Sequence, residues 1–161
     1  MKKWWAVIAL TLVPLAGFAS GGGVELENAK IDLKSNESIQ RGGKYFVNYC
    51  MGCHSAKYVR YKQFTEVGLT EDDVRENLMF GDGKIGDLMT ISMAAEDASR
   101  WFGATPPDLT LAARVRRDGA DGIYSYLKRF YTVPSRPMSV NNTVFPNVGM
   151  PHVLWDLQGI Q

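Results

Sequence analysis

Apolar residues recur along much of the chain at the spacing of α-helices, and runs with the two-residue alternation of β-strands are scarce. Ser35 is a residue type that favours the N-terminus of a helix. The apolar positions that follow it are Ile39, Phe46, Val47 and Cys50. We therefore expect a helix that starts after Ser35 and runs towards Cys50, with a weak point at Gly42 and Gly43.

Four later segments combine helical spacing with residues that start or end helices. Thr70 opens a capping box with Asp73, and Gly103 ends a helix-prone stretch. Asp108 and Asp121 are candidate N-caps for two more apolar patterns. The expected helices span about residues 71–78, 94–102, 109–116 and 122–130.

The pattern changes between Thr132 and Met150, where prolines and asparagines interrupt any periodicity. We expect a long ordered loop there, and a loop of this size in a compact domain is usually functional. The glycine-rich run from Gly81 to Gly86 matches neither nucleotide-binding fingerprint, so it is predicted to be a turn. The predicted fold class is mainly α, with long ordered loops between the helices.

Composition and charge narrow the class of protein. The chain has 161 residues, of which 45% are hydrophobic and 22% are charged, as in an ordinary globular domain. Its formal net charge of +1 offers no basic field that would attract nucleic acid. Nucleic acid is therefore excluded as a partner.

Residues 1–19 have the organisation of a secretory signal peptide. Lys2 and Lys3 precede a mostly apolar run, and Ala19 ends a small-residue cleavage site. A membrane anchor is the alternative, but the run is shorter than the ~20 residues of a spanning helix and contains Pro14. We expect cleavage after Ala19, which leaves one exported domain of residues 20–161.

The two cysteines carry the strongest chemical signal. Cys50 and Cys53 are followed by His54, which gives the Cys-x-x-Cys-His motif of covalent heme attachment. Two intervening residues let both thiols reach the vinyl groups on one porphyrin edge, and the next side chain then offers its imidazole to the iron. A thioredoxin-like pair would not need the histidine, and a zinc site would lack ligands. We therefore predict one covalently bound heme c.

The ligand on the other face of the iron determines the chemistry. Methionine or histidine gives an electron carrier, whereas an open position permits ligand binding or peroxidase chemistry. Met150 is favoured, because Gly149 permits a close approach of the backbone to the porphyrin and Pro151 keeps Met150 extended. His152 is the alternative. The other internal methionines are Met51, Met79, Met89, Met93 and Met138.

Four separated stretches resemble the cytochrome c1 family, the heme subunits of ubiquinol–cytochrome c reductase. They are residues 41–55, 103–110, 114–125 and 145–151. The Cys-x-x-Cys-His motif alone is common to all c-type cytochromes. The run Gly-Ala-Thr-Pro-Pro-Asp-Leu-Thr at 103–110, followed by Arg-Val-Arg at 114–116, is what distinguishes this family from the others.

The resemblance implies a cytochrome c-like helical heme-binding domain with particular roles for six residues. Heme c would be attached through Cys50 and Cys53. His54 and Met150 would be the axial ligands of the iron. Pro107 would pack on the heme, and Arg116 would pair with a propionate, a role that Arg114 or Arg117 could also fill.

The resemblance also implies a place in a respiratory chain. The heme would accept an electron from the Rieske iron–sulfur protein and pass it to a cytochrome c, beside cytochrome b on the periplasmic side of the bacterial inner membrane. Such a subunit is not an enzyme on its own. Members of the family end in a membrane-spanning helix that this chain does not contain up to Gln161, so we expect a truncated sequence.

Two other functions remain open at this point. A diffusible periplasmic c-type cytochrome, serving another oxidase or reductase, would need no anchor. A heme enzyme or gas sensor would have an open iron position, a high-spin ferric heme and ready binding of carbon monoxide.

Overall fold

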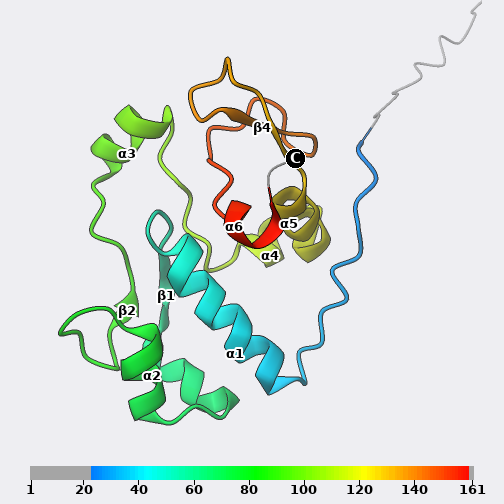
Figure 1. Ribbon diagram of the computed structural model, residues 1–161. Helices are drawn as coiled ribbons and strands as arrows, with labels where there is room; N and C mark the ends of the chain where they lie inside the picture. Colours follow the sequence, from blue (N-terminus) through cyan, green and yellow to red (C-terminus); the bar gives the residue numbers. More distant parts are fainter. Residues whose placement is uncertain (1–22, 160–161) are drawn as a thin grey trace, which may run out of the picture.

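A computed structural model describes residues 23–159, and these form a helix-rich fold with four short strands (Figure 1). This confirms the predicted mainly α class. The predicted signal peptide, residues 1–19, lies outside the described residues.

The elements are α1 (Asn36–Tyr45), η1 (Phe46–Cys50), β1 (Ala56–Arg60), η2 (Tyr61–Val67), α2 (Glu71–Leu78), β2 (Leu88–Met89), α3 (Ala95–Phe102), α4 (Ala112–Val115), α5 (Gly119–Lys128), β3 (Phe130–Thr132), β4 (Val140–Asn142) and α6 (Trp155–Gln158).

Three predicted helix ends are confirmed. The hydroxyl of Ser35 accepts a hydrogen bond from the backbone N–H of Ser38 and so caps α1. Thr70 and Asp73 form the predicted capping box of α2, with each side chain bonded to the other residue's backbone N–H. Helix α3 ends at Gly103, whose φ of +76° is a left-handed conformation that glycine adopts without strain.

Two predicted N-caps are wrong. Helix α4 covers only Ala112–Val115, and the carboxylate of Asp108 instead accepts hydrogen bonds from the backbone N–H groups of Lys57 and Thr110. Helix α5 begins before Asp121, whose carboxylate accepts from the N–H of Ala29. In both cases the carboxylate satisfies a backbone donor from outside the helix that it was expected to start.

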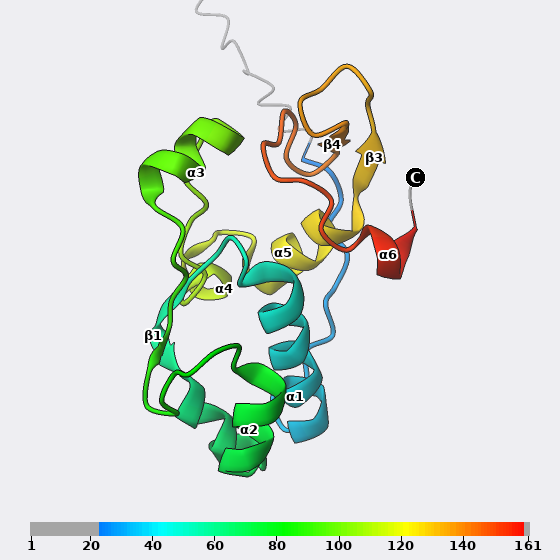
Figure 2. The same ribbon diagram turned by 60° about the vertical axis from the view of Figure 1, so that its left-hand side comes forward.

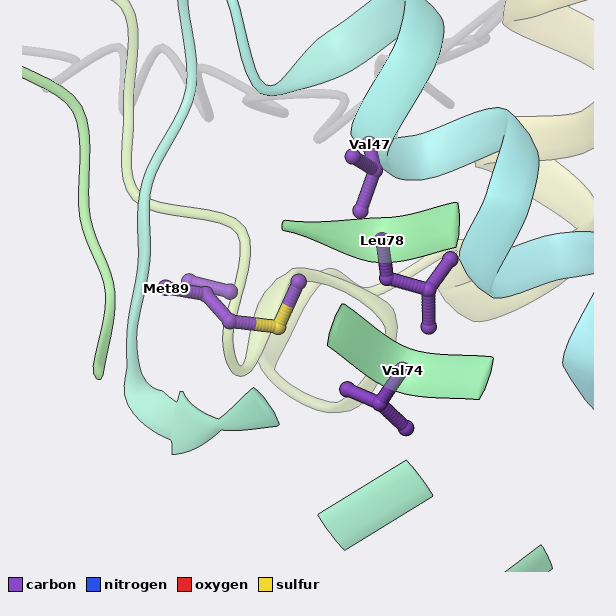
Figure 3. Close-up of a cluster of buried hydrophobic side chains, with 5 residues drawn as sticks. Val47, Val74, Leu78 and Met89 are labelled. Carbon is purple, nitrogen blue, oxygen red and sulfur yellow. The ribbon is translucent and has the colours of Figure 1, made fainter. Parts of the chain in front are cut away.

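A small hydrophobic core joins η1, β1, α2 and β2. Its buried members are Val47, Ala56, Val74, Leu78 and Met89. Figure 3 shows four of them: Leu78 and Val74 of α2 lie next to each other, with Val47 above Leu78 and Met89 beside them. Figures 1 and 2 show these elements together with α1 at one end of the molecule, while α5 and the β3–β4 pair lie towards the other. We call the part around this core the α2 lobe.

The predicted loop between Thr132 and Met150 contains more regular structure than expected. Strands β3 and β4 pair antiparallel, with Phe130 opposite Asn142. The buried Asn142 amide donates to the carbonyl of Tyr126, and its oxygen accepts from two backbone N–H groups of the following turn. The Asn142 side chain thus ties the turn after β4 to the end of α5.

An extended N-terminal strap, residues 24–31, runs along α5 to the start of α1 (Figure 2). The hydroxyl of Ser125, which is fully buried, accepts from the N–H of Glu27 at 2.7 Å. The Glu27 carboxylate forms ion pairs with Lys128 and Arg129. The strap therefore joins two regions of the chain that are about 100 residues apart.

No helix within residues 23–159 is both long enough and apolar enough to cross a membrane.

Candidate heme-binding site

The Cys-x-x-Cys-His motif forms one tight helical turn at the end of η1. The last bond of the π-helix runs from the N–H of Met51 to the carbonyl of Phe46, at 2.9 Å. The carbonyl of Cys50 then accepts from the N–H groups of Cys53 and His54, at 3.0 and 2.9 Å. Both thiols are free rather than joined in a disulfide, and both are half-buried. The turn presents two thiols and one imidazole from five consecutive residues.

The imidazole of His54 is oriented by the segment that follows α3. Its Nδ1 lies 2.7 Å from the carbonyl oxygen of Pro107. A carbonyl can only accept, so Nδ1 carries the proton and the lone pair is on Nε2. Metal-bound histidines usually have this arrangement, with the second nitrogen bonded to a carbonyl or carboxylate. The geometry of His54 therefore fits an iron ligand.

The segment around Pro107 runs beside the residues that follow His54, in register with them. The N–H of Leu109 donates to the carbonyl of Ser55 at 2.8 Å. The N–H of Lys57 donates to the carboxylate of Asp108 at 2.8 Å. These hydrogen bonds join the Pro-Pro-Asp-Leu run to the residues that follow the heme motif, so each segment holds the other in place.

The protonation of Asp108 follows from the same contacts. Burial raises its pKa, but hydrogen bonds from Lys57 and Thr110 outweigh this effect, and the net pKa lies below the usual range. The carboxylate is therefore charged at neutral pH. It holds the Pro107 segment at the heme motif by charge-assisted bonds.

The electrostatics of the cysteines do not fit the alternatives to heme. Burial raises the pKa of the Cys50 thiol, and the neighbouring Cys53 raises it further. Thioredoxin-like pairs instead have a lowered pKa at the attacking cysteine. Across residues 23–159, no three side chains of His, Cys, Asp or Glu come together as a metal cluster.

Met150, the predicted second axial ligand, is half-buried beside α5. Its sulfur lies 3.4 Å from the hydroxyl of Tyr126. Burial raises the pKa of Tyr126 to about 12, against the opposing charge of Arg116, so the phenol is a hydrogen-bond donor at neutral pH. The backbone of the preceding Gly149 lies close to Phe102: a Cβ on Gly149 would lie 2.9 Å from the carbonyl oxygen of Phe102.

His152, the alternative ligand, lies flat against Phe130. The two rings are 4.9 Å apart and almost parallel, with an angle of 3° between their planes. Its Nδ1 is buried and has no hydrogen-bond partner among the described residues. An unpaired buried nitrogen is unfavourable, so the ring is a reasonable donor or acceptor for a group that binds beside it.

Arg116 is engaged by a neighbour that the sequence analysis did not single out. Its Nε and Nη2 lie 2.8 and 2.6 Å from the two carboxylate oxygens of Asp118. This bond lowers the pKa of Asp118 and raises that of Arg116.

The structure brings the predicted residues together in two groups. His54 and Pro107 form one, next to Cys50 and Cys53. The other consists of Met150, which contacts Tyr126 of α5, and Arg116, which lies just before the start of the same helix. Within residues 23–159 no hydrogen bond joins the two groups. Tyr126 and Ser55 were missed because their contacts with Met150 and Leu109 join distant parts of the chain. Asp118 lies only two residues from Arg116, so a carboxylate close to an arginine was a signal that could have identified it.

Comparison with known proteins identifies the family. The sequence matches the Cytochrome C1 family over residues 30–159. It is 54% identical over 162 aligned positions to "Cytochrome c1" of Allochromatium vinosum, with 100% of this chain and 66% of that protein covered. It is 44% identical to "Ammonia monooxygenase gamma subunit" of Nitrosomonas europaea, with 96% and 65% covered. With "Cytochrome c1, heme protein, mitochondrial" of Saccharomyces cerevisiae it shares 29% identity, over 80% of this chain and 50% of that protein.

The chain thus spans two thirds or less of the length of these relatives. The cofactor of the matched family is one covalently bound heme c, and Cys50, Cys53 and His54 stand in the arrangement that attaches it. The match extends over most of the described residues and includes both halves of the site. The chain belongs to the cytochrome c1 family.

Proposed function

We propose that this chain is the heme-bearing part of an electron-transfer subunit. Cys50 and Cys53 would hold heme c through thioether bonds, and Nε2 of His54 would bind its iron. When bound, the heme supplies reversible one-electron chemistry at its iron. The single observation that carries this proposal is the 2.7 Å contact between His54 Nδ1 and the Pro107 carbonyl, which leaves Nε2 available beside the two thiols.

For the second axial position we propose Met150, with His152 as the alternative. A thioether sulfur has two lone pairs, so Met150 can bind iron and still accept the hydrogen bond from Tyr126. Together with His54 this gives His/Met ligation, which raises the reduction potential relative to two histidines. The buried, unpaired Nδ1 of His152 is the observation that keeps the alternative open.

We propose that Pro107 and Arg116 contact the heme itself. Pro107 is exposed and its carbonyl is bonded to His54, so its ring is available to pack against the porphyrin. The guanidinium of Arg116 is a suitable partner for a propionate, because a partly buried carboxylate needs a charged donor. Neither residue acts as an acid or base, since electron transfer makes and breaks no covalent bond.

In the cell, we propose that the heme accepts electrons from a Rieske iron–sulfur protein and passes them to a cytochrome c. The partners would be cytochrome b and the Rieske subunit of a ubiquinol–cytochrome c reductase, at the periplasmic side of the bacterial inner membrane. The signal peptide predicted at residues 1–19 and the 54% identity to a bacterial cytochrome c1 support this location.

A heme protein with an open iron position is the second candidate. We consider this candidate because the chain is similar to a protein named as an ammonia monooxygenase subunit, although that name describes only the relative. The two candidates differ in spin state. His/Met ligation gives a low-spin heme that resists carbon monoxide, whereas an open position gives a high-spin ferric heme that binds it.

Covalent attachment can be tested with the exported chain, produced together with a heme-attachment system. The alkaline pyridine spectrum should show two thioether bonds in the wild type, one in Cys50→Ala or Cys53→Ala, and no attached heme in the double variant. Because each lost thioether leaves a vinyl group in conjugation, the α band moves to longer wavelength. A wild-type chain that gives no covalently bound heme would overturn the proposed function.

A further inference from the structure

We propose that Asp118 is a positioning residue that holds the guanidinium of Arg116 for a heme propionate. The proposal rests on the propionate role proposed for Arg116 above. Asp118 would not touch the heme. It would act by fixing the direction in which Arg116 points.

The bond pattern allows Arg116 to have two carboxylate partners at once. A guanidinium carries five N–H groups in one plane. The bidentate pair with Asp118 uses one edge of that plane, through Nε and Nη2. Three N–H groups remain for a second carboxylate. Asp118 therefore orients Arg116 without consuming its capacity to bind a propionate.

The position of Asp118 is itself fixed by the local backbone. Its carboxyl group packs over the first turn of α5, where a Cβ on residue 122 would lie 2.0 Å from Cγ of Asp118. Gly122 is therefore required for this placement, since no side chain fits in that space. The N–H of Gly119 closes the turn on the carbonyl of Arg116 at 3.1 Å. The backbone of residues 116–122 therefore fixes the geometry of the Arg116–Asp118 pair.

The pair lies at the start of α5, the helix that carries Tyr126. The hydroxyl of the half-buried Tyr126 contacts the sulfur of Met150, and the charge of Arg116 opposes the rise in the Tyr126 pKa. The Asp118 side chain is 25% exposed and that of Arg116 is 42% exposed. The half-buried carboxylate of Asp118 keeps its bidentate geometry with the exposed Arg116 better than a fully solvated carboxylate would, and an aligned donor is what a propionate would need.

The test uses the heme-loaded protein and the resonance Raman bending bands of the heme propionates, which report their hydrogen bonds. We expect Arg116→Gln to shift these bands, and Asp118→Asn to shift them in the same direction by a smaller amount. In the Arg116→Gln background, Asp118→Asn should add nothing, because its effect passes through Arg116. Asp97→Asn is the matched control, since it breaks a comparable Asp–Arg pair on α3.

The outcomes separate this inference from the proposed function. Bands unchanged in Asp118→Asn but shifted in Arg116→Gln would show that Arg116 needs no positioning and would overturn the inference. An equal shift in both backgrounds would overturn it too, because Asp118 would then act directly. Unchanged bands in Arg116→Gln would remove Arg116 and Asp118 from the heme site, while covalent heme in the pyridine spectrum would leave the proposed function intact.

Discussion

A single proton at His54 determines whether this residue can bind iron. The carbonyl of Pro107, at 2.7 Å, holds that proton on Nδ1 and leaves Nε2 free. The motif places the histidine, but the orientation of its ring comes from a residue 53 positions later in the chain. At the scale of residues, the site therefore depends on backbone atoms as much as on side chains.

The second axial ligand can be assigned by exchanging Met150 and His152 separately. Met150→Ala should convert a low-spin heme with a high potential into a high-spin heme that binds carbon monoxide. His152→Ala should leave the spin state unchanged. Absorption spectra and a redox titration distinguish the two. A heme that remains low-spin with an unchanged potential in Met150→Ala would assign the position to another residue.

The Arg116–Asp118 pair should make stability depend on pH. The bond lowers the pKa of Asp118 in the folded protein, so its contribution is fully present above the pKa of the unfolded carboxyl group, near 4. It is lost as the pH falls through the folded pKa. We expect Asp118→Asn to reduce the free energy of unfolding by about 1 kcal/mol or less at pH 7, because the pair is partly solvated. The difference should shrink in denaturant titrations as the pH falls below the unfolded pKa; a difference that does not change with pH would contradict the electrostatic cause.

At the scale of elements, two neighbouring glycines in α1 differ sharply in their surroundings. A Cβ on Gly43 would lie 2.3 Å from the ring of Phe64, whereas a Cβ on Gly42 would meet nothing within 4 Å. We expect Gly43→Ala to destabilise the protein by about 1–3 kcal/mol through overpacking. Gly42→Ala should stabilise it by about 0.5–1 kcal/mol, since alanine favours the helix. Thermal unfolding of the two variants checks this opposition, and equal effects would contradict it.

The sequence predicts elements well where local chemistry alone fixes them. Ser35, Thr70 and Gly103 act within a few residues of themselves, and all three helix ends were predicted. Asp108 and Asp121 were misassigned because each binds a backbone N–H more than 50 residues away. Helix propensity is a local property and cannot predict such contacts, since they form only once the chain is folded.

The same distinction applies to the site. Cys50, Cys53 and His54 form a local turn, and the motif predicts it. The contact of Met150 with Tyr126 joins residues 24 positions apart, and no periodicity predicts it. Asp118, by contrast, lies only two residues from Arg116, and its pairing with that arginine was overlooked. The hairpin of β3 and β4 was likewise missed, because its strands are only three residues long and the prolines between them hide any alternation.

At the scale of the whole molecule, the N-terminal strap and α5 stabilise each other. The hydroxyl of Ser125 is buried and bonds to the backbone of Glu27. We expect Ser125→Ala to cost about 1–2 kcal/mol and to speed hydrogen exchange at the Glu27 amide, because that N–H loses its partner. Ser99→Ala, at an exposed position of α3, is the matched control. Unchanged exchange at Glu27 would contradict this role.

The direct contacts between residues 54–58 and 107–110 have a consequence for how this chain tolerates changes in length. Because the two segments hold each other, their alignment does not depend on the path that the chain takes between them. That path contributes Val74, Leu78 and Met89 to the buried core of the α2 lobe, whose other members, Val47 and Ala56, come before it. The exposed turn from Gly81 to Lys84 lies within it, on the route from α2 to β2. Residues can therefore be inserted or deleted at this turn while the imidazole of His54 keeps its direction.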